Sequence, residues 1–508
     1  MSQKTTFITT PIYYISGEPH IGHVYTTIAA DVLRRTALTR GSAFLLTGTD
    51  EHGQKVAAAA AAAGISPQAW TDALVPRWQA LTTRFGVVCD DFIRTTEERH
   101  QRVVVAVFEA LKARGEVYLG TYEGWYCTND ETFWLEAKLV DGRCPNPECR
   151  REVQWISEQN WFFSLAKYRD RLLAYYRANP HWLKPQSVWN EMYAAIESGL
   201  EDLCISRSNV SWGVPLPDSR VMYVWLDALL NYISAIGYGV DPSRFEAYWP
   251  ADVQLIGKDI ARFHAIIWPA LLWALDLPLP RLVYAHGWLT VDGQKMSKSR
   301  GNVVNPFALA DRFGADAVRY FLLREAAFGS DFSYSEQKIL QRYVSDLGND
   351  LGNLVHRSLA MLAKYRDSLV PAIAPSSLVL PAQHLGERVY EAFAGLQFRE
   401  GLDAVWELVS GLNRLIDERK PWALAKAGED AALDALLYEI CEGLRWIALC
   451  LEPIMPEKAR AMWQQLGLAG EPTGSWAELL QWGLLPPGTR TVPGAPLFPR
   501  LLDDVPVA

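Results

Sequence analysis

The sequence predicts a doubly wound α/β domain that carries an insertion and is followed by an all-helical bundle. Strand patterns alternate with helical patterns before residue 116 and again after residue 212. Between these two stretches the alternation stops, and aromatic residues, Gly, Pro and three Cys are crowded together. After about residue 336 the apolar residues recur only at helical spacing. A chain of 508 residues has room for about three domains of ordinary size.

The α/β part is predicted from short apolar runs separated by helical segments. The strands are expected within residues 5–15, 43–47, 221–225, 253–256 and 282–285. Helical spacing begins at Val24 and continues to Gly41, and it dominates residues 81–119. The alanine run at 57–63 predicts a surface helix without chemistry. Strand–helix alternation of this kind implies a parallel sheet with helices on its faces.

Domain boundaries follow from the same change of pattern. We expect residues 1–115 and 213–335 to be the two halves of the α/β domain, 116–212 the insertion, 336–467 the helical bundle and 468–508 an extended tail. One of three apolar stripes in the bundle consists of Leu402, Trp406, Val409, Leu412 and Ile416.

Composition excludes several classes of protein. Lys plus Arg is 49 and Asp plus Glu is 58, so the net charge is −9 and there is no generally basic coat for nucleic acid. Any RNA would have to be held by local patches. No apolar run approaches the ~20 residues of a membrane span, and the first residues carry no secretory signal. Seven Cys, an odd number, fit a reducing cytoplasm better than a disulfide framework.

A pair of histidines lies where the first strand gives way to a helix. In His20-Ile21-Gly22-His23 the two imidazoles are three residues apart and share a helix face. A helix N-terminus favours anions, and Gly22 leaves room for a phosphate or a base to approach. By themselves the histidines are as consistent with a metal pair or with two surface residues.

A lysine pair lies in the second half of the α/β domain, in Lys295-Met296-Ser297-Lys298-Ser299. Asp292-Gly293 before it is a hairpin turn signal, and Gly301 follows it. Two lysines on a loop flanked by glycines suit a mobile clamp on phosphates. Alone, a Lys-x-x-Lys motif is typical of a solvated loop.

Together, the two motifs resemble those of the class I aminoacyl-tRNA synthetases, and the likeness along nearly the whole chain is to the methionyl-tRNA synthetase family. Five segments carry the resemblance: His20-Ile21-Gly22-His23, Tyr223-Val224-Trp225-Leu226-Asp227-Ala228, Gly257-Lys258-Asp259-Ile260 with Phe263-His264, Lys295-Met296-Ser297-Lys298-Ser299, and Gly314-x-Asp316-x-x-Arg319-Tyr320-Phe321-Leu322. The fold implied is a Rossmann-type catalytic domain, a connective insertion and an anticodon-binding bundle. Because the chain ends at Ala508 without the appended tRNA-binding domain of some family members, we expect a monomer.

The resemblance implies a cytoplasmic methionine–tRNA ligase that uses ATP with Mg²⁺. Methionine's carboxylate would attack the α-phosphorus of ATP, and the 3' end of initiator or elongator methionine tRNA would then take the methionyl group. His20, Gly22 and His23 would contact the phosphates, and Lys295 and Lys298 would hold them through the transition state. Gly257 and Asp259 would lie near the nucleotide ribose.

The family's methionine pocket carries over to a set of mostly apolar and aromatic side chains. These are Ile12, Tyr14, Asp50, Trp225, Ala228, Tyr232, His264 and Ile267, with Asp50 as the partner of the ammonium group. Methionine must be recognised by shape, since its thioether hardly forms hydrogen bonds. Leu229 stands where the family often has Pro. Without the resemblance, aromatic residues after a strand would be assigned to the core.

In the bundle, Asn353, Arg357, Pro421 and Trp422 resemble the family's anticodon-binding residues. Trp422 would be a stacking platform for a base, and Asn353 and Arg357 would contact base edges. The alternative is that Asn353 and Arg357 belong to a surface helix and that Trp422 is a core residue.

The insertion carries Cys127, Cys144 and Cys149, and the family often has a zinc knuckle here. This chain departs from the paired Cys-x-x-Cys pattern, because Asp130 stands three residues after Cys127. A Cys₃Asp set is an acceptable zinc site; the alternative is a decayed knuckle with free thiols. In either case we expect the knuckle to be structural and distant from His20 and Lys298.

Three other functions compete with this interpretation. Synthetases for Leu, Ile and Val carry an editing insertion much larger than the about 100 residues found here. The synthetase for Cys binds zinc in its active site, but no Cys accompanies the pocket residues Tyr14, Trp225 and His264 in this sequence. A non-catalytic RNA-binding paralogue would have a damaged His or Lys motif, and both are intact. A simpler nucleotidyltransferase would not need the helical bundle.

Overall fold

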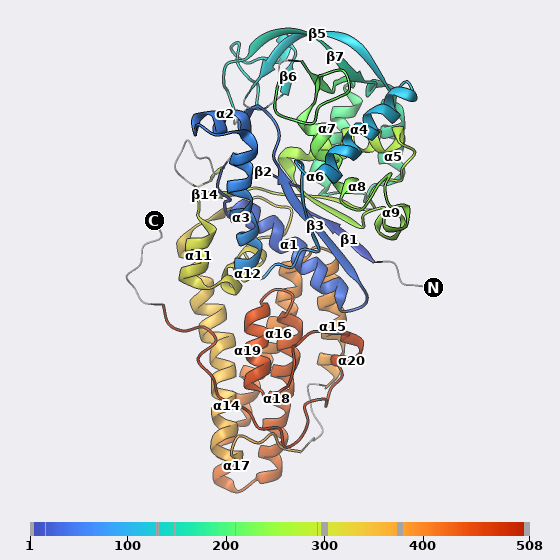
Figure 1. Cartoon of the computed structure of the whole chain (residues 1–508). Coiled ribbons are helices and arrows are strands. Elements are labelled where there is room, and N and C mark those ends of the chain that lie inside the picture. The colour runs from blue at the N-terminus through green and yellow to red at the C-terminus, as the bar shows by residue number, and fades with distance from the viewer. Residues whose placement is uncertain are drawn as a thin grey trace.

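The computed structural model describes residues 5–15, 17–128, 130, 132–146, 149–208, 210–291, 293–295, 303–372 and 379–501. Figure 1 shows an α/β lobe built from the first two thirds of the chain and a lobe of long helices built from the rest, with α1 between them. The expected fold class, a doubly wound α/β domain with an insertion followed by a helical bundle, is confirmed. Within the described ranges, no helix is both long and apolar enough to cross a membrane.

The main sheet has seven strands, all of them parallel. Its order is β2 (Tyr13–Tyr14), β3 (Ala43–Asp50), β1 (Thr6–Thr9), β12 (Val253–Gly257), β13 (Val283–His286) and β8 (Leu183–Lys184), and β4 (Asp91–Arg94) also pairs with β3. β1 lies between β3 and β12, which come from the two halves of the domain. Because both faces are covered by helices, the central strands are almost fully buried, as parallel sheets require.

Helices follow most of these strands. They are α1 (Ile21–Leu38), α2 (Gln54–Ala62), α3 (Pro67–Arg84), α4 (Glu98–Ala113), α7 (Val224–Leu229), α8 (Asn231–Ser234), α9 (Pro242–Tyr248), α10 (Trp268–Ala274), α11 (Pro306–Phe313) and α12 (Ala315–Arg324), with a π-helix over Phe263–Ile267 and a 3₁₀ turn over Lys258–Ile260. α1 is buried on most of its surface, since polar residues such as Thr27 and Asp31 are buried as well as the apolar stripe that includes Val24 and Ile28. It therefore packs both under the sheet and against α12 and the bundle, in one continuous core.

The insertion forms its own antiparallel sheet in the order β6 (Thr132–Trp134), β5 (Val117–Cys127), β7 (Gln154–Phe163) and β9 (Leu203–Cys204). A 3₁₀ turn lies at Glu136–Lys138 and another at Ala166–Tyr168. We expected strand–helix alternation to stop across the whole insertion. It resumes in the second half, because α5 (Arg169–Ala178), β8 and α6 (Gln186–Glu197) follow β7. β8 joins the main sheet beside β13.

Residues 81–119 are helical at their start and over α4, as expected, but β4, which is short and has no apolar alternation, interrupts them and β5 begins at Val117. One local expectation was wrong. Residues 221–225 are not one strand, since β11 (Val221–Met222) pairs with β10 (Ser206–Arg207) and α7 begins at Val224. The hairpin expected at Asp292-Gly293 is present: β14 (Leu289–Val291) pairs with β15 (Gln294–Lys295), Gly293 has φ 73°, and β16 (Phe332–Tyr334) extends this sheet.

The bundle is helical from Glu336 onward. It contains α13 (Glu336–Arg342), a π-helix over Tyr343–Gly352, α14 (Asn353–Arg366), α15 (Val379–Ala394), α16 (Phe398–Arg419), α17 (Pro421–Ala427), α18 (Asp430–Leu451) and α19 (Pro456–Gln465). The tail holds one short helix, α20 (Trp476–Leu479), and otherwise packs as extended chain. Buried Glu442 and Arg445 of α18 bind its backbone between Leu479 and Leu485.

The two lobes are joined by a buried arginine. The Arg319 guanidinium on α12 donates to Asp31 Oδ2 of α1 at 2.7 Å and to the backbone oxygens of Phe85, Pro453 and Ile454. Beside it, Asp316 Oδ2 accepts the backbone N–H of Lys458, in the first turn of α19, at 2.7 Å. Because these groups are fully buried, the contacts fix α1, α12 and the start of α19 to one another.

Candidate active site

A cavity of about 350 Å³ opens at the carboxyl ends of the parallel strands, where ligands bind in open α/β sheets. Most of the candidate residues named from the sequence line it. They are Ile12, Tyr14, His20, Gly22, His23, Asp50, Trp225, Ala228, Tyr232, Gly257, Asp259 and His264. Leu229, at the position where the related family often has Pro, is a lining residue too. The cavity thus brings together side chains from both halves of the domain.

The two histidines cap helix α1. His20 is the N-cap residue, and its Nδ1 accepts the backbone N–H of Gly22 at 3.1 Å. His23 Nδ1 accepts the backbone N–H of His20 at 3.1 Å. The rings stack with their centroids 3.7 Å apart. Since a neutral imidazole that accepts at Nδ1 carries its proton on Nε2, each ring presents an N–H donor at the positive end of the helix dipole.

Glycines bring backbone close to the cavity. A β-carbon on Gly257 would lie 2.6 Å from Asp259 Oδ1, and one on Gly287 would lie 2.3 Å from the backbone of Ser330. Gly287 therefore excludes any side chain, whereas a side chain at Gly257 would force the Asp259 carboxylate to turn away. Asp259 follows β12 in an exposed turn, so its carboxylate can meet the hydroxyl groups of a ligand in the cavity.

The apolar end of the cavity is uncharged. His264 Nδ1 donates to the Ile260 oxygen at 3.1 Å, so its Nε2 accepts the Tyr232 hydroxyl at 2.7 Å. Burial lowers the pKa of His264 to about 4, so the ring is neutral near pH 7. Trp225 stacks on Phe263 with the ring centroids 3.8 Å apart and the planes at 10°. Aromatic and neutral surfaces of this kind suit an apolar side chain, and Asp50 supplies a nearby negative charge.

Three candidates are not placed in the cavity. Ile267 is buried in the core behind it and is not among its lining residues. The backbone of Lys295 lies in β15, next to the cavity residue Leu289 in the same small sheet. Lys298, with Met296, Ser297, Ser299 and Gly301, lies outside the described residues.

Sequence reasoning missed several lining residues, among them Lys55, Asn231, His286 and Trp288. Lys55 is the one Lys or Arg among the described lining residues, and its ammonium lies 5.7 Å from the centre of the Tyr14 ring. His286 Nδ1 donates to the Gly287 oxygen at 2.8 Å, and its Nε2 accepts the Thr26 hydroxyl at 2.6 Å. Lys55 could have been found from its place five residues after Asp50, whereas His286 carried no distinctive spacing.

The candidate anticodon residues lie around the junction of α14, α16 and α17. Arg357 donates to Asn413 Oδ1 at 2.8 Å and pairs with Asp417 at 3.2 Å, near the end of α16. Asn353 is exposed one turn earlier on α14. Buried Pro421 begins α17, and Trp422 beside it is 49% exposed. An indole exposed to that extent is poorly explained as a core residue.

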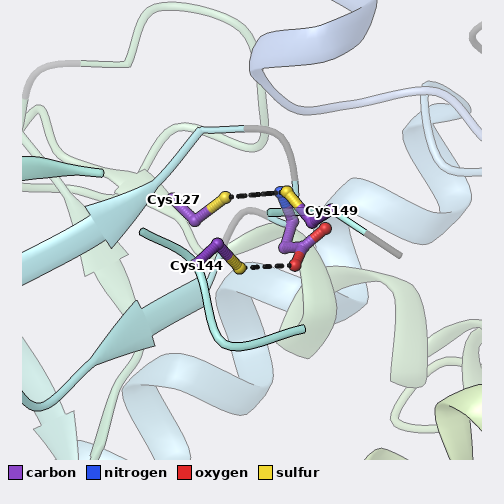
Figure 2. Close-up of side chains that lie close together, drawn as sticks. Cys127, Cys144 and Cys149 are labelled. Atoms are coloured by element: carbon purple, nitrogen blue, oxygen red, sulfur yellow. Dashed lines mark hydrogen bonds between the residues drawn. The ribbon is translucent and has the colours of Figure 1, made fainter. Parts of the chain in front are cut away.

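The three cysteines and Asp130 form one cluster. Their ligand atoms all lie within 4.8 Å of one another, and Figure 2 shows the sulfurs of Cys127 and Cys149 facing each other and that of Cys144 facing a carboxylate oxygen. Cys127 and Cys149 sulfurs are 3.4 Å apart, and Cys144 Sγ lies 3.0 Å from Asp130 Oδ2. None of the seven cysteines, all of which lie in the described part of the chain, forms a disulfide. Four donors at these separations fit a tetrahedral zinc ion with bonds of about 2.0–2.3 Å.

The cluster is not distant from the cavity, contrary to expectation. Asp130 lines the cavity together with His20. Asp130 follows Cys127, the last residue of β5, so the turn after this first strand of the insertion reaches the cavity.

Comparison with known proteins gives consistent matches. The family model described as "tRNA synthetases class I (M)" matches residues 6–359. The methionine–tRNA ligase of Caldanaerobacter subterraneus is 48% identical over 98% of this chain and 79% of its own length, and that of Thermotoga maritima is 44% identical over 97% and 80%. The Mycobacterium tuberculosis methionyl-tRNA synthetase in complex with methionyl-adenylate superposes with a TM-score of 0.93 at 42% identity, covering 98% of this chain and 100% of that one. The free-state structure of the same Mycobacterium tuberculosis enzyme superposes with a TM-score of 0.87 at 38% identity, covering 99% of each chain.

Proposed function

Because the chain belongs to the methionine–tRNA ligases of class I, we propose that its cavity joins methionine to ATP and then passes the methionyl group to tRNA. The enzyme activates L-methionine as methionyl-adenylate and transfers it to the 3' end of methionine tRNA, both initiator and elongator. The observation that carries the proposal is the single cavity that contains His20, His23, Asp50, Trp225 and His264.

Activation needs alignment and charge neutralisation more than proton transfer. The methionine carboxylate is already ionised and attacks the α-phosphorus of ATP, and pyrophosphate leaves. His20 and His23 donate Nε2–H groups to the phosphates at the N-terminus of α1. Lys295 and Lys298 follow the phosphates through the transition state, and Mg²⁺ accompanies ATP as part of the substrate. Asp259 and the bare backbone of Gly257 receive the ribose.

Methionine is recognised by shape at one end and by charge at the other. The Asp50 carboxylate binds the ammonium group. Trp225, Ala228, Tyr232 and neutral His264 surround the thioether, with Ile12 and Tyr14 closing the remaining wall. Ile267 supports this wall from the core. A charged His264 would favour amino acids with polar side chains over methionine. Its burial prevents this, because burial lowers the pKa of the ring and keeps it neutral.

The other segments of the chain are assigned to tRNA binding and to structural support of the catalytic domain. We assign residues 1–115 and 213–335 to the catalytic domain, 116–212 to the connective insertion and 336–467 to anticodon binding, with Asn353, Arg357, Pro421 and Trp422 as the contacts and the tail at 468–508. Cys127, Asp130, Cys144 and Cys149 hold one structural zinc ion. The enzyme acts in the cytoplasm as a monomer.

The test is ATP–pyrophosphate exchange with each of the twenty amino acids. Methionine should stimulate exchange far above leucine, isoleucine or cysteine. Homocysteine should be the main misactivated analogue, because a missing methyl group costs a shape-reading pocket only about 1–3 kcal/mol. A different amino acid as the best substrate would refute the proposal.

A further inference from the structure

A carboxylate is buried behind the cavity between two histidines. Asp227 on α7 is fully inaccessible, and its Oδ2 lies 2.6 Å from His52 Nδ1. Its Oδ1 lies 2.7 Å from His100 Nε2 on α4. Neither histidine lines the cavity. A buried carboxylate is stable only when donors satisfy it, so both histidines must keep their N–H groups on Asp227.

The three side chains join separate walls of the cavity. His52 lies two residues after Asp50, the proposed ammonium site. Asp227 lies between Trp225 and Ala228, which form the side-chain wall. His100 continues to Ser234 Oγ at 2.8 Å, on the same short helix as Tyr232.

The segment around Asp50 is fixed on its far side as well. The Glu51 carboxylate accepts two hydrogen bonds, at 2.7 and 2.9 Å, from Arg94, the last residue of β4. The Trp212 indole donates to the Glu51 backbone oxygen at 2.6 Å and packs edge-on against the His52 ring. With the segment held in this way, the His52–Asp227 bond sets how far the Asp50 strand end lies from α7.

We propose that Asp227, held by His52 and His100, is a positioning residue that fixes the distance between the ammonium site and the side-chain wall, and so sets the selectivity for amino-acid length. This inference rests on the proposed roles of Asp50 and Trp225 in methionine binding. Methionine and homocysteine share the ammonium and differ at the far end by one methyl group. A pocket whose two ends shift apart loses the methyl contact and with it the preference for methionine.

The experiment compares variants of the full-length enzyme by ATP–pyrophosphate exchange. Asp227→Asn keeps the size of the side chain but removes the charge. His52→Val removes the donor, whereas His52→Asn keeps an N–H close to the place of Nδ1. Glu442→Gln in α18 is the matched control, since Glu442 is equally buried and hydrogen-bonded but lies in the bundle.

Asp227→Asn and His52→Val should raise the KM for methionine about tenfold, equivalent to about 1.4 kcal/mol. They should leave the KM for ATP within about twofold and lower the preference for methionine over homocysteine by about the same tenfold factor. His52→Asn should recover most of both losses. Glu442→Gln should lower Tm without changing either preference or KM.

Unchanged methionine KM and selectivity in folded variants would overturn the inference, as would equal losses for ATP and methionine or no recovery in His52→Asn. If Asp227→Asn fails to fold by circular dichroism, the two His52 variants decide the matter. Failure of the wild-type enzyme to exchange with methionine would overturn the proposed function instead, so the two failures are distinguishable.

Discussion

At the residue scale, the chemistry around the cavity depends on which nitrogen of each imidazole is engaged. His20 and His23 use Nδ1 to cap α1, so the backbone selects the tautomer that donates from Nε2. In His264 the bond from Nδ1 to Ile260 leaves Nε2 as an acceptor. One residue type thus supplies N–H donors at one end of the cavity and a neutral wall at the other.

Lys298→Ala should lower kcat for adenylate formation by much more than it raises the KM of methionine. The reason is that an ammonium group placed on the phosphates meets charge that redistributes in the transition state, whereas the methionine side chain is bound elsewhere in the cavity. Steady-state and single-turnover exchange measure the two effects separately. Lys338→Ala, in α13, is a suitable control because Lys338 pairs with Glu325 away from the cavity. A lost affinity for methionine with intact kcat would contradict the assignment.

Many cavity residues could be named from the sequence because they belong to motifs with fixed spacing. Residues such as His286 and Trp288 could not, since each reaches the cavity only after distant strands and helices come together. Ile267, a position inferred from a resemblance, is buried in the core and is not among the lining residues of the cavity, so its role in methionine binding stays a prediction.

At the scale of elements, α17 carries the most testable assignment. Trp422→Ala should cut aminoacylation of methionine tRNA by roughly tenfold to a hundredfold, because one base–aromatic stack is worth about 1–3 kcal/mol. Exchange without tRNA should hardly change, since α17 lies at the far end of the helical lobe from the α/β lobe (Figure 1). Trp422→Phe keeps an aromatic surface and should retain most of the activity. Equal losses in exchange and aminoacylation would identify Trp422 as a structural residue.

A second prediction concerns the zinc content of the cysteine cluster that follows β5. Purified protein should carry about one zinc per chain by elemental analysis, and Asp130→Ala should lower that content, because four donors at zinc-like separations lie together. Cys89→Ala is the control, since Cys89 is a free thiol outside the cluster. Absence of zinc, with Cys127, Cys144 and Cys149 all reactive in the folded protein, would identify a decayed knuckle.

Elements with strong periodicity could be predicted, and those defined by their partners could not. The long helices of the bundle show apolar stripes that match α16 and α18 closely. β8 has two residues and β4 four, so each exists only because a neighbouring strand is already in place. The apolar run 221–225 likewise divides into β11 and α7, because only its first two residues have a neighbouring strand, β10, to pair with.

At the scale of the whole molecule, the joint between the lobes should make stability depend on pH. Burial raises the pKa of Asp316 to about 7, against the lowering effect of Arg319. Because the folded value lies above the unfolded one, the stabilising contribution is full below about pH 4 and is lost as the pH rises through about 7. Asp316→Asn, which keeps an acceptor for Lys458, should therefore raise Tm by roughly 2–4 °C at pH 8 and by little at pH 4.

Thermal unfolding between pH 4 and pH 8 checks this prediction. Asp311→Asn on neighbouring α11 is the control, because that carboxylate is exposed and should show no such trend. A gain at pH 4 that disappears at pH 8 would contradict the proposed cause. The joint itself could not be foreseen, since Asp31, Arg319 and the loop before α19 are remote from one another in the sequence.

The central place of β1 has a consequence for how the protein is made. The Phe7 N–H is bonded to Asp252, 245 residues later, and β12 follows at once. A ribosome adding about 5–20 residues per second needs about 12–50 s to supply that partner. During this interval β1 can pair with β3 while its other edge stays open, a state prone to association with other chains. We expect that a chaperone, or early folding of the insertion between the two halves, would protect that edge until β12 arrives.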